Sequence, residues 1–418
     1  MHLTNIQNSL RYYLEYPKRF AGFVAQKLAR LLQRTHYSSE VLGPPKGYYR
    51  STKLWSESAS TSTSKEHGLV SYQEVYPEQL LKRSPPITFE PDVHWKYKRE
   101  YEKISPAAFV ATVPGGRVFG EYGAIITSGD KLLEDVSRVH GNKSVETHPV
   151  FSQVKLPKLL TLAGDGAVLS VAGGHGFFHW MFDLLPRLHL LRQADVDLDS
   201  VDWFIVNELR LPFQHETLAH FNIFEDRIVE SKKSPHVKLK KLILPSLAGR
   251  TGNMPNWVCQ FLRQEFLSAQ NTSDFSDYDR IYVSRNASNR RKILNEAALL
   301  PILSKFGFRR VQLENFSIYQ QANLFSNAQI VISPHGAGLS NLVFCQPKTK
   351  VIEIFSPNYV NVCFWSLSNQ MRLEYYYLLG EGDRPTGTQD PHKSRENITV
   401  NLDEVEQMLA FALSSSKS

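Results

Sequence analysis

Cysteine is scarce in this chain. Its 418 residues include three cysteines, Cys259, Cys345 and Cys363, and no two of them form a C-x-x-C pair. Disulfide frameworks and structural zinc sites both need several cysteines at characteristic spacings. H-E-x-x-H spacings of histidine and carboxylate are absent as well. The sequence therefore predicts a reducing compartment and no metal site.

Long apolar runs are also missing. No segment reaches the roughly 18 apolar residues of a membrane-spanning helix. The N-terminus lacks the apolar core and the small-residue cleavage site of a signal peptide. We expect a cytoplasmic protein that is soluble or, if it is peripheral, lies at the inner face of the membrane.

Residues 1–65 are predicted to form an N-terminal extension. Residues 3–34 are basic and roughly amphipathic, with a break at Pro17, which suits contact with an anionic membrane surface. A helix packed against the body of the protein, or a frayed leader, fits the pattern equally well. Ser56–Lys65 (SESASTSTSK) is typical of a flexible polar linker.

The remaining composition is that of a globular protein with an excess of positive charge. Hydrophobic residues make up 42% and charged residues 21%, and 48 Lys and Arg against 41 Asp and Glu give a net charge of +7. This charge suits an anionic ligand, a membrane surface or nucleic acid. No RNA- or DNA-binding motif accompanies it, so nucleic acid is not a predicted partner.

Short β-branched runs alternate with helix-length segments, which is typical of βαβ units and parallel sheets. We predict an α/β fold with two Rossmann-like halves. The expected domains are residues 66–250 and 251–390, with a capping helix at 402–414 in a tail of residues 391–418. Strands are expected at 124–127, 167–171, 203–206, 241–244, 280–284, 308–313, 329–333 and 350–355, and helices at 178–193, 212–221, 255–269, 294–306, 317–327 and 338–343.

The loop from His335 to Gly338 follows the apolar run Ile330-Val-Ile-Ser-Pro and precedes a helix-compatible segment. Small residues allow backbone N–H groups to approach an anion closely, and the next helix adds a favourable dipole. We predict that His335, Gly336, Ala337 and Gly338 contact a phosphate group. The alternative is a turn in which His335 only caps the helix.

A second strand, Arg280-Ile-Tyr-Val, leads into Ser284, Arg285, Arg290 and Arg291. Arginine forks match phosphate oxygens bidentately, and ligands of open α/β sheets sit at the carboxyl ends of strands. The two strand ends together predict a phosphorylated ligand, most simply a nucleotide. A solvated surface loop is the competing interpretation.

Glu353 lies in the apolar strand Val351-Ile-Glu-Ile-Phe, where a carboxylate needs a partner or a function. It is a candidate to accept hydrogen bonds from a ribose or a sugar. A salt bridge to a nearby arginine explains it equally well.

The segment from Gly173 to Arg187 brings together titratable groups and glycines. If residues 176–185 are helical, His175, His179 and Asp183 fall at i, i+4 and i+8 on one face. Such a cluster can supply a general base, and Gly174 leaves room for a substrate near the backbone. Pro186 limits this picture because it ends or kinks the helix.

These segments, taken together, resemble glycosyltransferase family 61. The resemblance rests on H-W-M-F-D-L-L-P-R at 179–187, on Y-V-S-R followed by R-R and N-E within 282–296, and on H-G-A-G-L-S-N at 335–341 with V-I-E at 351–353. It extends over about residues 150–385.

The resemblance implies a GT-B fold with two halves facing a cleft, and inverting transfer of a hexose or pentose from a nucleotide sugar to a glycan or polysaccharide. Arg285, Arg290 and His335–Gly338 would then bind the diphosphate. Asp183, favoured as the base, and His179 would lie in the acceptor half, with Gly174, His175 and Arg187 on the acceptor side. A non-catalytic nucleotide- or glycan-binding protein is the alternative.

The absence of a signal or anchor points to a bacterial-type cytosolic enzyme of surface-polysaccharide synthesis. Asp195-Val-Asp-Leu-Asp199 contains the D-x-D pattern of metal-dependent sugar transferases. It follows a helix in a polar loop instead of ending an apolar strand, so we interpret it as a solvated turn. We expect metal-independent transfer without a cofactor.

Overall fold

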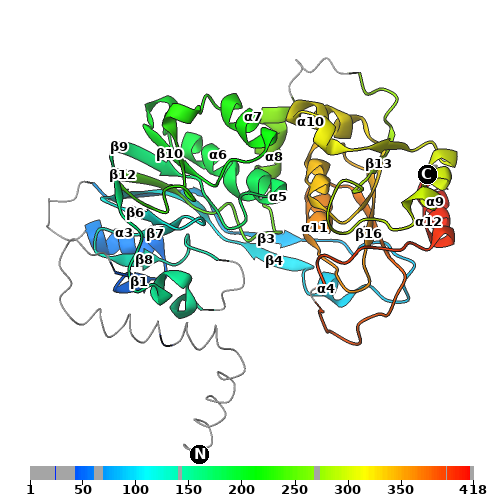
Figure 1. The fold of residues 1–418 in the computed structure, drawn as a ribbon, viewed down its shortest axis with the longest axis horizontal. Helices are drawn as coiled ribbons and strands as arrows, with labels where there is room; N and C mark the ends of the chain where they lie inside the picture. The colour runs from blue at the N-terminus through cyan, green and yellow to red at the C-terminus, as the bar shows by residue number, and fades with distance from the viewer. Residues whose placement is uncertain are drawn as a thin grey trace, which may run out of the picture.

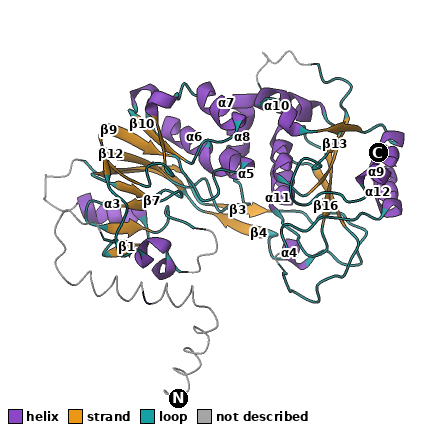
Figure 2. Cartoon of the chain, in the orientation of Figure 1, coloured by secondary structure: helices purple, strands orange, loops and turns teal. Residues whose placement is uncertain are grey.

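The computed structural model of the chain describes residues 43–60, 69–139, 144–267, 274–391 and 393–414, together with Val24. Two sheets lie side by side along the long axis of the molecule (Figure 1). Strands and helices alternate in both parts, so the predicted α/β class is confirmed (Figure 2). The predicted extension at residues 3–34 lies outside the described residues apart from Val24.

The first sheet is mixed and has ten strands among the described residues, in the order β1-β8-β7-β6-β12-β9-β10-β11, with β5 on β12 and β2 on β5. Strands β12, β9, β10 and β11 are parallel to one another, whereas β5 and β6 run antiparallel to β12. Its strands are β1 (Gly47–Tyr49), β2 (Ser71–Tyr76), β5 (Ala108–Pro114), β6 (Arg117–Phe119), β7 (Ala124–Ile126), β8 (Lys131–Leu133), β9 (Leu160–Val168), β10 (Trp203–Val206), β11 (Ile228–Glu230) and β12 (His236–Pro245).

The second sheet is entirely parallel, with the order β14-β13-β15-β16-β17 in the described part of the chain. Successive side chains alternate between two faces, as in Val331 and Ile332, which belong to different buried clusters. The strands are β13 (Arg280–Val283), β14 (Arg309–Val311), β15 (Ile330–Pro334), β16 (Lys350–Phe355) and β17 (Glu374–Leu379).

Helices cover both faces of this parallel sheet, which explains why its strands are apolar on both sides. The helices α9 (Glu296–Lys305) and α12 (Leu402–Ser414) pack on the outer face through Leu303 and Met408. The helices α10 (Ile318–Asn327) and α11 (Cys363–Gln370) lie on the face toward the first sheet (Figure 1).

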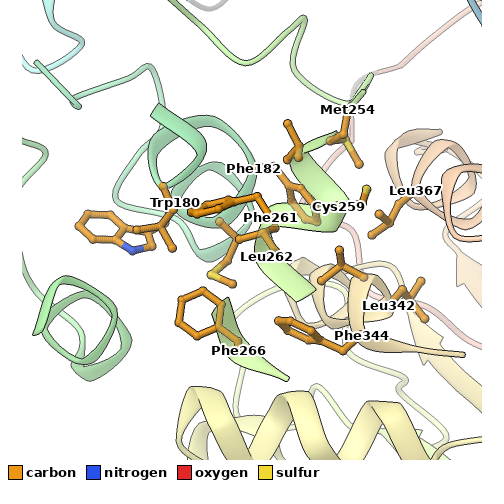
Figure 3. Close-up of a cluster of buried hydrophobic side chains, with 14 of the residues drawn as sticks. Trp180, Phe182, Met254, Cys259, Phe261, Leu262, Phe266, Leu342, Phe344 and Leu367 are labelled. Carbon is orange, nitrogen blue, oxygen red and sulfur yellow. The ribbon is translucent and has the colours of Figure 1, made fainter. Parts of the chain in front are cut away.

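One buried cluster joins the two sheets. Helix α8 (Asn256–Phe266) lies between them and contacts both α6 (Pro186–Gln193) and the 3₁₀ segment η8 (Ala337–Phe344). Burying one Leu, Phe or Met side chain stabilises the fold by about 1.5–3 kcal/mol. The continuous core between the sheets therefore holds their relative position. Figure 3 shows part of it, including Trp180, Phe182, Met254, Cys259, Phe261, Leu262, Phe266, Leu342, Phe344 and Leu367.

The N-terminal part of the chain also reaches the second sheet. A hairpin of β3 (Gln79–Lys82) and β4 (Glu102–Ser105) encloses a segment that contains the short helix α4 (Trp95–Lys98). Within it, Ile87 exchanges backbone hydrogen bonds with Tyr375 and Tyr377 of β17, at 2.9 and 3.0 Å. Residues 83–101 therefore pack on the second sheet, although in the sequence they come before the central strands β9 and β12 of the first sheet.

Several elements differ from expectation. Ser56–Ser60, predicted as the start of a flexible linker, belong to helix α3 (Thr52–Ser60), whose Thr52 is anchored to Asp135. The helix predicted at 178–193 is divided into α5 (Phe177–His179), a π-helical turn (Trp180–Leu184) and α6, because Pro186 cannot continue the hydrogen-bond ladder. The remaining helix of the first half is α7 (Pro212–His220), as predicted.

Within the described residues, no helix is both long enough and apolar enough to span a bilayer.

Candidate functional site

A cavity of about 410 Å³ lies where loops of the two sheets meet. We call it the arginine cavity. Its volume falls within the usual range for small-ligand pockets. Its walls combine residues 173–179, which follow β9, with residues that follow β13, β15 and β16. The lining residues are Gly173, His175, Gly176, Phe177, Phe178, His179, Thr251, Gly252, Arg290, Arg291, His335, Ala337, Asn361, Cys363 and Phe364.

The sheet topology explains why residues far apart in sequence meet here. Strands β13, β15 and β16 are adjacent and parallel, so their carboxyl ends share one edge. Arg290 and Arg291 follow β13, and His335 follows β15 directly. The predicted convergence of the two motifs at one edge is therefore present in the structure, at the position where open α/β sheets bind ligands.

His335 is held by a buried chain of hydrogen bonds. Its Nδ1 lies 2.5 Å from Glu353 Oε1, and the Tyr375 hydroxyl donates to Glu353 Oε2 at 2.5 Å. The Tyr97 hydroxyl lies 3.2 Å from that of Tyr375. Glu353 thus contacts neither a ligand cavity nor an arginine directly. Its role is to position His335, which corrects both sequence interpretations of this carboxylate.

The surroundings of His335 and Glu353 favour the uncharged form of both side chains. Burial raises the pKa of Glu353 well above its usual range, and the pKa-lowering contributions of Tyr375 and Arg291 are smaller. Burial, together with the charges of Arg291 and Arg285, lowers the pKa of His335 well below its ordinary value. In the uncharged pair the Glu353 carboxyl donates to Nδ1, so the His335 proton sits on Nε2. That N–H is the one left for an anion in the cavity that His335 lines.

The three arginines have different environments. Arg290 is exposed and lines the cavity. Arg291 is buried, with its backbone at φ 56°, and its Nε donates to the carbonyl of His335 at 2.8 Å. Arg285 lies behind the loop and donates to Ser288 Oγ at 2.8 Å, while its buried Nε has no hydrogen-bond partner in the described part of the chain.

These guanidinium groups repel one another. Burial, followed by the charges of Arg291 and Arg290, lowers the pKa of Arg285 to about 10. Among the described residues, no carboxylate lines the arginine cavity. Positive charge gathered without a neighbouring carboxylate is stabilised when an anion binds. The cavity therefore suits a phosphate or diphosphate group.

The glycines of the His335–Gly338 loop have packing roles. A Cβ on Gly336 would lie 1.8 Å from Arg285 Nη1, so only glycine allows the guanidinium to approach this closely. A Cβ on Gly338 would lie 2.8 Å from Leu313 Cδ1. Two residues of the loop, His335 and Ala337, line the cavity. Gly336 and Gly338, which were predicted to contact the ligand, are not among the lining residues.

Ser284 also differs from its predicted role. Its hydroxyl donates to Glu296 Oε1 at 2.6 Å and accepts from Arg310 at 3.1 Å. The Tyr282 hydroxyl donates to the same Glu296 oxygen at 2.8 Å. This network fixes the end of β13 to the start of α9, so Ser284 supports the arginine loop instead of binding a ligand.

Replacing Gly336 with Ala tests the arrangement of this loop. The backbone at Gly336 is extended, with φ −179°, so alanine causes no backbone strain. The new Cβ meets the far end of the Arg285 side chain, which can move. We expect Gly336→Ala to fold with an unchanged melting temperature and to bind nucleotide diphosphates more weakly than wild type, as calorimetry would measure. A loss of thermal stability comparable to a core mutation would show that the loop itself is strained.

On the opposite wall, His179 and Asp183 form a pair. His179 Nδ1 lies 2.7 Å from Asp183 Oδ2, and the Thr251 hydroxyl approaches the same oxygen at 3.4 Å. Asp183 belongs to the π-helical turn Trp180–Leu184, a type of irregularity that is frequent at functional sites. The predicted proximity of His179 and Asp183 is confirmed. Thr251 had no motif of its own and was not predicted.

Aromatic residues connect the two walls. Phe178 of α5 lies 5.7 Å from Phe364 of α11, and Phe364 lies 5.4 Å from the ring of His335. Both phenylalanines line the arginine cavity. This contact brings His179 and the arginine loop to the same cavity although they come from different sheets, and Asp183 lies next to this cavity through its contact with His179.

Three predicted acceptor-side residues have other roles or positions. His175 lies in a turn before α5 and not on the helical face of His179, although it lines the arginine cavity. Gly174 is buried, and a Cβ there would lie 2.0 Å from Asn207 Oδ1. Arg187 is 1% exposed and donates to the carbonyls of Ser170 and Pro245. Burial lowers the pKa of Arg187 to about 9. Arg187 therefore joins the segments at the ends of β9 and β12, and Gly174 leaves room for the side chain of Asn207.

The Asp195–Asp199 loop lies away from this site. It precedes β10, whereas the Gly173 turn follows β9, and β9 and β10 are parallel, so the two lie at opposite edges of the sheet. Asp197 Oδ1 accepts from the backbone N–H of Asp199 at 3.0 Å, as in a capped turn. In the described residues, no group of three potential metal ligands is present there or elsewhere.

The fold and the site define an α/β protein that gathers cationic side chains at the carboxyl edge of a parallel sheet, opposite a histidine–aspartate pair. Residues 177–352 match the family described as Glycosyltransferase 61. The match begins at α5, includes the His179–Asp183 pair and both anion-binding motifs, and ends within β16. Over this range the chain is similar to glycosyltransferase family 61.

A shorter stretch of the chain is similar to a rice protein. The chain is 39% identical over 64 residues to a protein named Beta-1,2-xylosyltransferase RCN11 from Oryza sativa subsp. japonica. The matched stretch covers 15% of this chain and 12% of the rice protein.

Proposed function

We propose that the protein transfers a hexose or pentose from a nucleotide sugar to a glycan or polysaccharide, with inversion at the anomeric carbon and without a metal ion. The observation that carries the proposal is the arginine cavity, whose opposite wall includes His179, the hydrogen-bond partner of Asp183. In this view the two sheets form the two lobes of a GT-B enzyme, with the donor held by the second sheet.

The proposed reaction assigns a task to each wall. Asp183 removes the proton from an acceptor hydroxyl, whose oxygen attacks the anomeric carbon. The bond from that carbon to the diphosphate breaks, and its electron pair leaves with the diphosphate. Arg290 and His335 stabilise the negative charge that develops there. His179 and Thr251 orient the Asp183 carboxylate.

Metal independence is proposed because arginine side chains already lie where a metal ion would neutralise the diphosphate. Arg290 and Arg291 are permanently charged, and His335 offers an N–H donor. A divalent ion at the same place would be repelled by them.

A nucleotide-sugar panel in EDTA tests this function. Hexose and pentose donors with different bases are screened by thermal shift, since a ligand at 100 times its dissociation constant stabilises by about 2.7 kcal/mol. We expect one donor to raise the melting temperature and to release nucleotide diphosphate when glycan acceptors are added. Donor binding without release would favour the non-catalytic binding protein, and activity restored only by manganese or magnesium would refute metal independence.

A further inference from the structure

A second, larger cavity adjoins the catalytic pair. It encloses about 650 Å³ and includes both Asp183 and Thr251 in its lining, while Thr251 also lines the arginine cavity. We call it the acceptor cavity. An acceptor hydroxyl must reach the base from the side opposite the departing diphosphate, because inversion requires in-line attack. Asp183 lines the acceptor cavity and not the arginine cavity, so an acceptor bound there approaches the base from outside the proposed donor site.

Arginines from three separate loops surround the acceptor cavity. Arg50 follows β1, Arg138 follows β8 and Arg250 follows β12, and all three are exposed residues that line the cavity. None of the motifs of the second sheet includes them, and the family match begins at residue 177, after Arg50 and Arg138.

The same lining also contains three carboxylates, Glu134, Asp135 and Asp183, but two of them are engaged by other side chains. Asp135 accepts from the backbone N–H and the hydroxyl of Thr52, at 2.8 and 2.7 Å, and burial raises its pKa. Asp183 is engaged by His179 and Thr251. Glu134 is the one remaining carboxylate among the described lining residues.

We propose that the acceptor cavity binds a glycan that carries an oxyanion, either the carboxylate of a uronic acid or a phosphate. Guanidinium forks bind both groups bidentately. Tyr122 and Leu247 in the same lining provide apolar surface for the sugar ring. The proposal rests on the proposed function, because it takes the occupant of this cavity to be the acceptor.

The experiment measures equilibrium binding of two matched probe pairs. The first pair is a galacturonic acid trisaccharide and its uncharged methyl ester, and the second is a disaccharide with and without a 6-phosphate. We expect at least one charged probe to bind about tenfold or more tightly than its neutral partner, which is the effect of one charge-assisted hydrogen bond. The pair that shows the preference identifies the oxyanion. If neither charged probe reaches this preference, the proposal is wrong.

Four variants assign the binding to a cavity. Arg50→Gln and Arg138→Gln should each reduce the charge preference, because both residues line the acceptor cavity. Lys158→Gln, an exposed cation outside both cavities, should keep it. If Arg290→Gln removes the preference while Arg50→Gln and Arg138→Gln retain it, the probe occupies the arginine cavity and the proposal is refuted.

The nucleotide-sugar screen on the same protein separates the two proposals. Donor binding and transfer without discrimination between charged and neutral probes would overturn this inference alone. Charge-selective glycan binding in a protein that binds no nucleotide sugar would overturn the proposed function, and the cavity would then be a glycan site without the assigned reaction.

Discussion

Asp183→Asn should lower turnover by about 10²–10⁴-fold, which is the usual contribution of a general base. Asparagine keeps the size of the side chain and an oxygen for the Thr251 hydroxyl, but it cannot take the proton of the acceptor. The affinity for the nucleotide should stay nearly unchanged, because Arg290 and His335 lie on the other wall. The measurement pairs turnover at saturating acceptor with calorimetric binding of the nucleotide.

A companion substitution identifies which member of the pair accepts the proton. In His179→Gln, the carboxylate of Asp183 remains while its 2.7 Å partner changes, so we expect a smaller loss than in Asp183→Asn. If Asp183→Asn retains more than about a tenth of turnover, it falls short of the effect of a base, and His179 becomes the candidate. A parallel collapse of nucleotide binding would instead mean that Asp183 supports the fold.

The second half of the chain was more predictable than the first. Every strand and helix predicted between 280 and 355 is present, with ends shifted by a few residues. Parallel strands buried on both faces are continuous apolar runs, such as Ile330–Ser333, that end at glycine or polar residues. The strand β17 and helix α11 were not predicted, because Glu374-Tyr-Tyr-Tyr lacks a turn signal that sets it apart.

In the first half, pairing depends on partners distant in sequence. Strands β5 and β6 join β12 through antiparallel contacts that span more than a hundred residues, which no local pattern encodes. Helix α3 was not predicted, because its serine-rich composition is typical of a flexible linker. It is fixed by Trp55, which is buried against the first sheet, and by the hydrogen bonds of Thr52 to Asp135.

The sequence identified several residues of the site by the chemistry of their side chains, but it did not predict what each of them contacts. His335 and Glu353 were both identified, yet only the pairing of β15 with β16 places them in contact, since Ser333 aligns with Glu353. Arg187 resembled a ligand-binding cation in the sequence. Its side chain instead satisfies the carbonyls at the ends of two strands, which a sequence cannot distinguish from binding an anion.

Removal of Arg290 and Arg285 should weaken nucleotide-diphosphate binding more than any other change at the donor wall. A hydrogen bond to a charged group is worth about 1.5–3 kcal/mol, so Arg290→Ala alone should raise the dissociation constant by roughly 10- to 150-fold. Arg285→Ala acts on the same loop from behind Gly336. The two losses should not add fully in the double variant, because neighbouring charges couple.

The stability of the unliganded protein distinguishes a binding role from a structural one. Arg290 and Arg285 repel each other, as the lowered pKa of Arg285 reflects, so Arg290→Ala should leave the melting temperature without ligand equal to or above that of wild type. Arg309→Ala is the matched control, since Arg309 lies at the opposite end of the sheet in an ion pair with Asp277 and should bind nucleotide normally. Unchanged affinity in both Arg290→Ala and Arg285→Ala would remove these arginines from the site. A lower melting temperature with normal affinity would mean that they only stabilise the loop.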